Sequence, residues 1–371
     1  MLRAEAIIDV GAIRANVERL CSGTSAEVMA VVKADGYGHG ILASARGALA
    51  GGATWLGTAT IDEALVLRAA GISAPTLAWL WTSVEYDAVR SALTADVDLS
   101  VSNTWQLDLV AKAARELDRV AKIHLKIDTG LSRNGSYRDD WPGLVDAAAR
   151  TDVVEPVGVW SHLAIADEPG HPTNGRQLRN FRDAVELAGE HGVRPRIQHV
   201  ANSAATLTLP DAHFDLVRAG VAVYGLSPVP SEGDFGLVPA MTLRACLASV
   251  KRVHGGEGVS YGHAYTTERD TTLALVPLGY ADGIPRNATN VAPVAVNGHR
   301  FTISGRVCMD QFVVDVGDLP VTERDEAVLF GSGRDGEPLA QDWADATGTI
   351  HYEIVSRVGT RVPRTYVGQP S

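Results

Sequence analysis

The sequence predicts an α/β protein in which an N-terminal (β/α)8 barrel of the TIM type is followed by a C-terminal mostly-β domain. Apolar runs alternate with amphipathic helical patterns over roughly the first 225 residues, which is typical of parallel α/β folds. There are eight such runs, the number of strands that closes a barrel. After a segment punctuated by Pro and Ser at 226–234, strands follow one another without helices between them. An open, doubly wound sheet is the alternative architecture, because alternation alone does not establish closure.

The predicted barrel strands are short apolar runs bounded by turn-forming residues. They lie at 28–33, 54–59, 75–80, 97–102, 122–128, 156–161, 196–200 and 216–224. Reactive groups of such barrels lie at the carboxyl ends of the strands, so residues at or just after these ends are the candidates for chemistry.

The clearest helix signal is a capping box formed by Thr60 and Glu63, in which each side chain accepts a backbone N–H of the other residue. Gly71 supplies the C-terminal stop of this helix. The ranges 102–117 and 174–192 carry similar amphipathic spacing and are predicted as helices between strands.

We place the domain boundary after residue 238, which gives a barrel domain at 1–238 and a β-rich domain at 239–371. The β-rich domain is predicted to contain strands at 243–250, 272–277, 293–296 and 312–316. Asn297-Gly298 is a dipeptide favoured in two-residue hairpin turns. A single helix is expected in this domain, at 341–346.

Composition and charge exclude several classes of protein. The chain of 371 residues carries a formal net charge of −11 and no basic cluster, which argues against nucleic-acid binding. No stretch approaches the roughly 20 apolar residues that span a bilayer, and the N-terminus lacks the apolar core of a signal peptide. Cys21, Cys246 and Cys308 are odd in number and far apart, which indicates reduced thiols rather than disulfides or a zinc site. We therefore expect a cytoplasmic protein that binds no nucleic acid, membrane or metal.

A lysine follows the first predicted strand directly and opens a glycine-rich loop, Lys33-Ala-Asp-Gly-Tyr-Gly-His-Gly. An ammonium group withdrawn from water has a lowered pKa, which is how lysines become Schiff-base formers and general bases. A surface lysine that happens to follow a strand is the alternative, and position alone does not decide between the two.

This loop resembles the cofactor-binding lysine segment of the alanine racemases, a family that uses pyridoxal 5′-phosphate. The resemblance covers nearly the whole chain, from Ile8-Asp9 to Arg361-Val-Pro-Arg364. It implies that Lys33 forms a Schiff base with the cofactor. It also implies that the protein interconverts L-alanine and D-alanine by two-base proton exchange and supplies D-alanine for peptidoglycan.

The resemblance assigns the cofactor phosphate to three segments. Tyr37 matches a tyrosine that reaches the phosphate. Asn202 and Ser203 open a short helix after the seventh strand, where a hydroxyl and backbone N–H groups could hold an anion. The alternative is that Ser203 is only the N-cap of that helix. Gly220 and Val221 match backbone contacts to the phosphate.

Arg218 stands inside the otherwise apolar eighth strand, and a buried arginine needs partners. By resemblance it donates a hydrogen bond to the pyridine nitrogen of the cofactor. Arginine does not release its proton, so the ring nitrogen would stay unprotonated and the cofactor would be a weaker electron sink, which suits racemisation. A structural pair of Arg218 with Asp215 is the alternative.

Inversion of a stereocentre by proton exchange needs an acid–base group on each face of the planar carbon. Tyr261 matches the second catalytic residue of the family, which makes Lys33 the base for D-alanine and Tyr261 the base for L-alanine. His162 follows the sixth strand and is assigned to the same cofactor site, as a hydrogen-bonding neighbour of Tyr261.

Recognition of the substrate carboxylate requires a cation or N–H donors. Arg133 matches the carboxylate-binding arginine of the family, and Met309 matches the residue whose backbone N–H is the other contact. Lys126 matches a lysine that is often carbamylated and then positions the arginine. A plain pair of Lys126 with Asp128 is the alternative.

A narrow access corridor would favour a small side chain, and four residues match its lining by resemblance: Asp167, Tyr280, Arg286 and Arg306. One position departs from the family, because Thr360 stands where many relatives carry a tyrosine. The strictness for alanine over serine therefore stays open.

The resemblance also implies a homodimer in which the β-rich domain of one subunit delivers Tyr261 to the barrel of the other. Two other functions are weighed against a racemase. Decarboxylases of basic amino acids share the barrel but place a carboxylate at the ring nitrogen, and Arg218 argues against them. A non-enzymatic carrier of the cofactor would be a barrel alone, and the β-rich domain argues against it.

Overall fold

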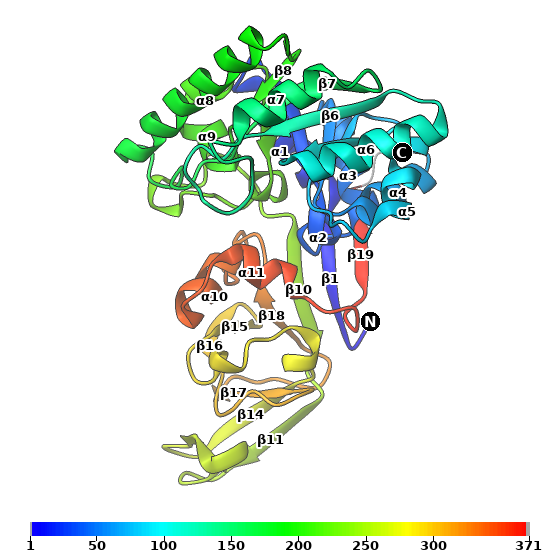
Figure 1. Ribbon diagram of the computed structural model, residues 1–371. Coiled ribbons are helices and arrows are strands. Elements are labelled where there is room, and N and C mark those ends of the chain that lie inside the picture. The colour runs from blue at the N-terminus through cyan, green and yellow to red at the C-terminus, as the bar shows by residue number, and fades with distance from the viewer. Residues whose placement is uncertain (1, 369–371) are drawn as a thin grey trace. The chain divides into compact units, whose positions relative to one another are not determined.

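Eight parallel strands form one sheet in the order β8-β7-β6-β5-β4-β3-β2-β9 (Figure 1). The strands are β2 (Glu27–Val31), β3 (Trp55–Thr58), β4 (Thr76–Ala78), β5 (Asp98–Val101), β6 (Ala121–Lys126), β7 (Val154–Trp160), β8 (Ile197–His199) and β9 (Leu216–Ala219). The edge strands approach each other, because the N–H of Asp215 donates to the Gln198 carbonyl (3.1 Å) and that of Arg218 to the Ala201 carbonyl (3.0 Å). The sheet is therefore a nearly closed barrel, as predicted, and the open-sheet alternative is wrong.

This computed structural model describes residues 2–368, which divide into two units. The barrel unit comprises Ile13–Gly36 and Ser44–Leu237, and the second unit comprises residues 2–12, Tyr37–Ala43 and 238–368. All eight strands predicted from apolar runs are present in the barrel unit. Most are shorter than predicted, and the last differs most, because its apolar run continues after Ala219 as a 3-10 helix, Val221–Tyr224. Short buried apolar runs do not distinguish strand from helix.

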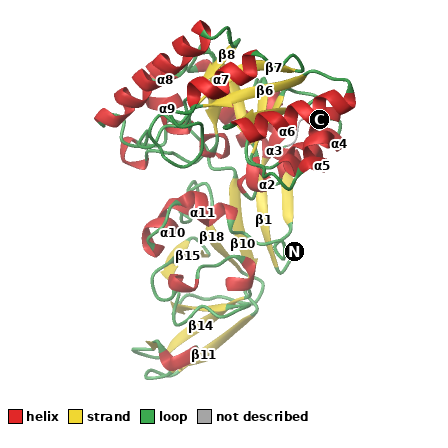
Figure 2. Cartoon of the chain, viewed as in Figure 1, coloured by secondary structure: helices red, strands yellow, loops and turns green. Residues whose placement is uncertain are grey.

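Helices alternate with the strands and cover the outside of the sheet (Figure 2). They are α1 (Val10–Ser22), α3 (Ile41–Ala50), α4 (Ile61–Ala69), α5 (Tyr86–Thr94), α6 (Thr104–Leu117), α7 (Trp141–Ala149), α8 (Pro172–Glu190) and α9 (Ser203–Thr208). The predicted capping box is confirmed, since Thr60 Oγ1 accepts the Glu63 N–H (3.3 Å) and Glu63 Oε2 accepts the Thr60 N–H (3.2 Å). Gly71, with φ of 78°, follows the end of α4 as expected.

A left-handed turn, α2 (Lys33–Tyr37), follows β2. The backbone φ angle is positive at four consecutive residues: Ala34 (53°), Asp35 (52°), Gly36 (61°) and Tyr37 (52°). Left-handed backbone costs a non-glycine residue about 1–2 kcal/mol, because Cβ crowds the following carbonyl. Strain of this kind concentrates at functional sites, and here it lies directly beside Lys33.

Glu63 holds this turn in place. Its Oε1 accepts the N–H of Ala34 (2.6 Å), while Oε2 accepts the N–H groups of Ala59 (2.9 Å) and Thr60. The residue that caps α4 therefore also fixes the loop after the first barrel strand.

The second unit is built mainly of strands (Figure 2). A six-stranded sheet has the order β16-β15-β18-β10-β1-β19, a three-stranded sheet has the order β11-β14-β17, and β12 pairs with β13. The strands are β1 (Ala4–Asp9), β10 (Met241–Cys246), β11 (Ser249–Val253), β12 (Gly258–Val259), β13 (Tyr265–Thr266), β14 (Thr271–Val276), β15 (Pro293–Val296), β16 (His299–Thr302), β17 (Phe312–Gly317), β18 (Glu326–Phe330) and β19 (Arg364–Val367).

The N-terminal strand β1 belongs to the second unit, although the expected division at residue 238 places it in the barrel domain. We expected residues 1–238 in one domain, but β1 pairs antiparallel with β10 and parallel with β19. Ala6 and Ile8 are fully buried in this pairing, and Ala6 lies opposite the buried Leu243. A strand with a buried apolar face takes whichever sheet completes it, and that choice is not local in sequence.

Within the second unit, the Asn297-Gly298 hairpin is confirmed, since both residues have positive φ and join β15 to β16. The run predicted as one strand at 243–250 is two strands, β10 and β11. The expected helix is α10 (Ala340–Thr347), but a second helix, α11 (His351–Ser356), was missed. It has only six residues, too few to show a helical period.

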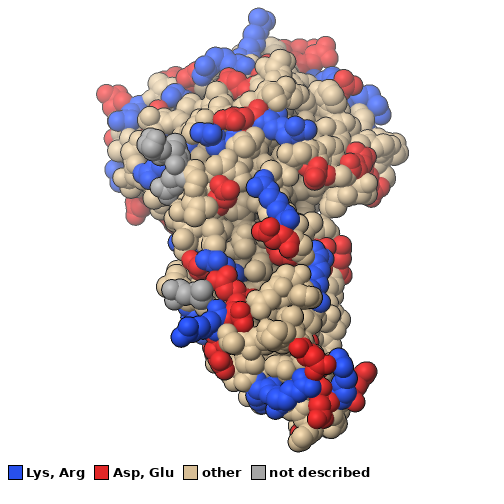
Figure 3. All heavy atoms as spheres, turned by 180° about the vertical axis from the view of Figure 1, so that it is seen from behind, with Lys and Arg blue, Asp and Glu red and all other residues tan. Residues whose placement is uncertain are grey.

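Positive and negative side chains are interspersed on the face of each unit shown in Figure 3. None of the helices within residues 2–368 combines the length and apolar character needed to cross a bilayer. The three cysteines are free thiols, as predicted.

The left-handed turn makes a prediction about stability. Ala34→Gly should raise the free energy of unfolding by about 0.5–1 kcal/mol, because relief of the Cβ clash outweighs the greater freedom of the unfolded chain. Ala15→Gly is the matched control, since Ala15 is exposed within the right-handed helix α1 and glycine there should cost about 0.5–1 kcal/mol. Urea unfolding measures the stability of both variants. A loss of stability in both would contradict the left-handed conformation of Ala34.

Candidate active site

Four basic side chains that sequence reasoning selected influence one another at the carboxyl ends of the barrel strands. Lys33 follows β2, Lys126 ends β6, Arg133 lies in the loop after β6, and Arg218 lies in β9. Burial and the nearby Arg133 lower the pKa of Lys33. Burial, Arg218 and Arg133 lower the pKa of Lys126 to about 7. A barrel mouth of this composition attracts anions.

Lys126 and Arg218 both lie over the ring of Trp160. Lys126 Nζ lies 4.2 Å from the centre of the Trp160 ring, and the Arg218 guanidinium carbon lies 4.7 Å from it. Asp128 Oδ1 instead accepts the N–H groups of Gly130, Leu131 and Ser132, and Asp215 Oδ2 accepts the N–H of Gln198. Among residues 2–368, no salt bridge joins Lys126 to Asp128 or Arg218 to Asp215, and the nearby Asp128 charge acts on Lys126 only by opposing the lowering of its pKa.

Arg218 is held entirely by neutral acceptors. Its Nη2 donates to the carbonyls of Ser161 (2.8 Å) and Val200 (3.1 Å) and to His162 Nδ1 (3.1 Å), while Nη1 donates to His199 Nδ1 (3.3 Å). Burial lowers the pKa of Arg218 to about 9, which leaves it protonated at neutral pH. Burial and Arg218 lower the pKa of both histidines well below the usual value, so both rings are neutral. Arg218 only donates, so each Nδ1 is an acceptor and each proton is on Nε2.

Ser203 is not the N-cap of α9, because Asn202 takes that role: its Oδ1 accepts the Ala205 N–H (3.0 Å). Ser203 Oγ instead accepts the N–H groups of Gly220 (2.8 Å) and Ala222 (3.3 Å). A hydroxyl that accepts two N–H groups directs its own proton elsewhere, and no acceptor for that proton is found in the part of the chain that the structure describes. Ser203 is thus oriented to donate to an added anion, and Val221 lies between its two partners.

These residues of the barrel unit fit pyridoxal 5′-phosphate. The group carries a dianionic phosphate, an aldehyde that condenses with a lysine, and a ring nitrogen that accepts a hydrogen bond. Ser203 offers a hydroxyl donor, Lys33 a lysine with lowered pKa, and Arg218 a rigidly held guanidinium.

Tyr37 belongs to the second unit and is almost fully buried there. Its ring centre lies 6.3 Å from that of Tyr352 on α11, and burial raises its pKa. Tyr352 was missed by sequence reasoning, which looked for a tyrosine at position 360 instead. Thr360 is exposed, whereas Tyr352 supplies a tyrosine beside Tyr37.

In the second unit, hydrogen bonds join three segments that carry four of the predicted residues. These residues are Tyr261, Tyr280, Arg306 and Met309. Ser260 Oγ, next to Tyr261, donates to the Arg306 carbonyl (2.7 Å) and contacts Cys308 Sγ (3.4 Å). The Tyr280 N–H donates to the Cys308 carbonyl (3.0 Å), one residue before Met309. Within this unit Tyr261 is 72% exposed, Met309 53% and Tyr280 44%, so all three side chains are accessible.

The remaining corridor residues are exposed. Asp167 lies between β7 and α8 in the barrel unit, and Arg286 begins a 3-10 helix in the second unit. Each is therefore accessible within its own unit.

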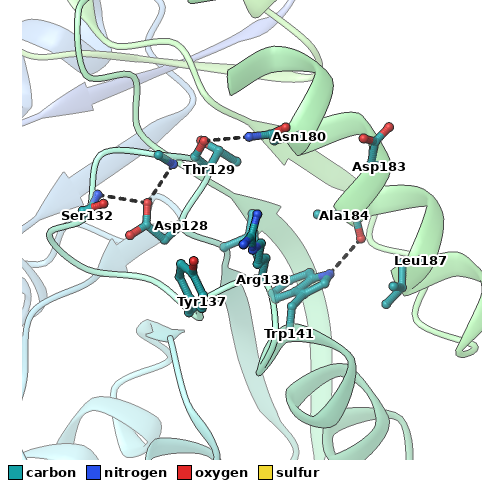
Figure 4. Close-up of a pocket in the computed structure, with 12 residues that line it drawn as sticks. Asp128, Thr129, Ser132, Tyr137, Arg138, Trp141, Asn180, Asp183, Ala184 and Leu187 are labelled. Atoms are coloured by element: carbon teal, nitrogen blue, oxygen red, sulfur yellow. Dashed lines mark hydrogen bonds between the residues drawn. The ribbon is translucent and has the colours of Figure 1, made fainter. Parts of the chain in front are cut away.

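A pocket of about 460 Å³ lies between the loop after β6 and helix α8 in the barrel unit (Figure 4). Trp141 Nε1 donates to the Ala184 carbonyl (2.9 Å) and Asn180 Nδ2 to the Thr129 carbonyl (3.1 Å), which ties its two walls together. Its lining shares the loop of Arg133 but contains none of the predicted catalytic residues. This pocket is distinct from the basic cluster.

Sequence reasoning also missed the residues that hold Arg218 from behind. His199 was noted only as part of a motif, and His124 and Asp98 were not noted. The available signal was the period of the strands: His124 lies two residues before Lys126 in β6, so both side chains face the barrel interior.

Two family models match the chain. Residues 8–228 match the alanine racemase N-terminal domain, and residues 240–366 match the alanine racemase C-terminal domain. Among curated proteins, the chain is 59% identical to alanine racemase of Salinispora arenicola over the full length of both. It is 57% identical to that of Thermobifida fusca, with 98% of each chain covered.

Solved structures agree with these matches. The alanine racemase of a D-cycloserine-producing Streptomyces lavendulae is 54% identical, with a TM-score of 0.98 and coverage of 100% of this chain and 98% of the other. The Bacillus anthracis alanine racemase with bound L-Ala-P is 35% identical, with a TM-score of 0.91 and coverage of 100% and 96%.

The hydrogen bonds of Arg218 make a prediction about stability. Arg218→Met leaves four buried acceptors without a donor, so the free energy of unfolding should fall by about 3 kcal/mol. Arg196→Met is the control, because the largely exposed Arg196 meets Glu155 at 3.7 Å on the surface and should change stability by less than about 0.5 kcal/mol. Urea unfolding of the cofactor-free proteins compares them, and equal effects would contradict the role of Arg218.

Proposed function

The chain belongs to the alanine racemase family, and on that premise we propose that it interconverts L-alanine and D-alanine with pyridoxal 5′-phosphate as cofactor. The observation that carries the proposal is the buried Arg218, which has no ion-pair partner among the described residues, in a positively charged barrel mouth that also holds Lys33, Lys126 and Ser203. When bound, the cofactor would acidify the α-carbon of an amino acid by withdrawing electrons from it.

Lys33 and Tyr261 act as the two bases in this proposal. Lys33 would hold the cofactor covalently, and its amine would exchange a proton with the α-carbon of D-alanine. Its lowered pKa increases the fraction of neutral amine available at physiological pH. Tyr261 exchanges the proton on the opposite face, that of L-alanine.

His162 supports Tyr261 in the proposed site. Its Nδ1 accepts from Arg218, so the Nε2 proton is free to be donated to a phenol oxygen. A neutral imidazole in this orientation stabilises the tyrosine oxygen when that oxygen has lost its proton.

Arg218 would donate to the ring nitrogen of the cofactor. Because arginine keeps its proton, that nitrogen stays unprotonated and electron withdrawal is limited, which favours prompt return of the proton to the α-carbon. Phosphate would be held by Tyr37, Ser203 and the backbone at Asn202, Gly220 and Val221.

Arg133 and the Met309 N–H would bind the substrate carboxylate. Lys126, with its pKa of about 7, carries an amine that is substantially neutral near pH 7 and can therefore add carbon dioxide. The resulting carbamate would be negative and would attract Arg133, where the lysine repels it.

We further propose a homodimer with shared sites. Tyr261, Tyr280 and Met309 form an outward-facing cluster of large side chains in the second unit, and such exposed apolar patches mark interaction surfaces. A second copy of the chain would receive this cluster at its barrel mouth. Asp167, Tyr280, Arg286 and Arg306 would then line a corridor that admits small amino acids. Supply of D-alanine for peptidoglycan and a cytoplasmic location are part of this proposal.

The proposed reaction is tested by chiral chromatography of the cofactor-loaded protein with L-alanine, L-serine and L-lysine. L-Alanine should approach an equal mixture of enantiomers fastest. Faster racemisation of serine would mean that the reaction is as proposed but that serine is the preferred substrate. Release of carbon dioxide from lysine would support a decarboxylase instead. No turnover of any of the three would reject the proposal.

The second base and the shared site are tested together by mixing two variants. Tyr261→Phe should lose turnover of L-alanine but keep the visible absorbance of bound cofactor, and Lys33→Ala should be inactive with no covalently held cofactor. Subunit exchange between them should restore about a quarter of wild-type activity, because half the dimers are mixed and each holds one intact site. Without restored activity in demonstrably mixed dimers, the two bases belong to one chain.

A further inference from the structure

A chain of four buried side chains crosses the barrel interior behind the proposed cofactor site. Asp98 begins β5, His124 lies in β6, His199 ends β8 and Arg218 lies in β9. Their exposed fractions are 4%, 0%, 0% and 4%. Asp98 Oδ2 lies 3.2 Å from His124 Nε2, His124 Nδ1 lies 2.9 Å from His199 Nε2, and His199 Nδ1 lies 3.3 Å from Arg218 Nη1.

Only one arrangement of protons satisfies this chain. Arg218 must donate to His199 Nδ1, so the His199 proton is on Nε2. If His124 donated from Nδ1, both nitrogens of His199 would be acceptors and the ring would carry no proton. His199 therefore donates to His124 Nδ1, and the His124 proton is on Nε2 and is donated to Asp98. The two ends of the chain fix the direction of every hydrogen bond together, because the guanidinium only donates and the carboxylate only accepts.

The two imidazole rings are locked by their surroundings. Trp160 stacks on His199 with ring centres 5.5 Å apart and planes at 4°, and Trp55 meets His124 edge-on at 5.5 Å. Gly158 lies directly against His124, and a Cβ added at position 158 would overlap the imidazole. The rings cannot turn to exchange their nitrogens without moving these neighbours.

We propose that Asp98 and His124 are positioning residues that fix the orientation of Arg218 toward the cofactor's ring nitrogen. This inference rests on the proposed function. Asp98 acts at a distance because a carboxylate only accepts, and this forces each successive ring to present an acceptor toward Arg218. Asp98 is also the carboxylate to which the Arg218 guanidinium is linked by hydrogen bonds, through the two neutral imidazole rings.

An asparagine at position 98 removes this constraint. Its amide presents an N–H as readily as an oxygen to His124 Nε2, so both histidine tautomers become free to reverse. The reversed form points the His199 Nδ1 proton at the Arg218 Nη1 donor. Arg218 would then leave its position, and the ring nitrogen of the cofactor would be open to protonation. Stronger electron withdrawal would favour transfer of the amino group, in which alanine is oxidised to pyruvate and the cofactor is reduced to pyridoxamine phosphate in equal amount.

The test compares Asp98→Asn and Gly158→Ala with wild type as cofactor-loaded proteins. Wild type must first racemise alanine, and if it does not, the proposed function fails and not this inference alone. Both variants should lower kcat about tenfold with KM for alanine within about twofold, because Arg133 and the carboxylate site are untouched. Pyruvate formed per racemisation should rise at least about tenfold, and the absorbance of bound cofactor should shift.

Asp96→Asn is the matched control, since Asp96 is an exposed carboxylate two residues away that pairs with Lys122. It should leave kcat and the pyruvate ratio unchanged. Because Gly158→Ala displaces the His124 ring without touching Asp98, it tests the same chain even if Asp98→Asn does not fold. If the pyruvate formed per racemisation is unchanged in the variants, the inference is overturned, whatever happens to kcat. A purely structural role could lower kcat or cofactor content, but it would not raise this ratio.

Discussion

The interior of the barrel is organised by a buried positive charge that has no ion-pair partner among the described residues. Arg218 donates to two carbonyls and two imidazoles, and these contacts fix its plane and its neighbours' protonation. The same charge helps to lower the pKa of Lys126 and keeps both histidines neutral. Binding of an anionic ligand to such a positively charged site is favourable, because the ligand supplies negative charge that the site lacks.

The loop after β2 adds a second constraint. Lys33 is followed by four residues of left-handed backbone. The Glu63 carboxylate accepts the N–H of the first of them, Ala34. Such backbone is unfavourable for Ala34 and Asp35, so it persists only because the surrounding structure determines it. The turn places the lysine at the end of a buried strand and sends the next residues, from Tyr37, into the second unit, where Tyr37 meets Tyr352.

Sequence reasoning located elements wherever the signal was local. Apolar runs identified the eight barrel strands, and Thr60, Glu63 and Gly71 marked both ends of α4, because capping and periodicity act within a few residues. It failed where the outcome depended on distant partners. Val221–Tyr224 is as apolar as a strand yet forms a 3-10 helix, and β1 joins β10 and β19 because its buried face is completed there.

The sequence by itself determined the barrel architecture, the family and the residue types available for chemistry, because periodicity and ordered motifs are properties of the chain. Only the tertiary structure decided which partners these residues take. It gave Asp128 and Asp215 backbone N–H groups as hydrogen-bond partners, and it joined Arg218 to Asp98 through His199 and His124. The physical reason is that burial makes each donor require an acceptor, and the strands that supply those acceptors direct them into the same barrel interior although they are distant along the chain.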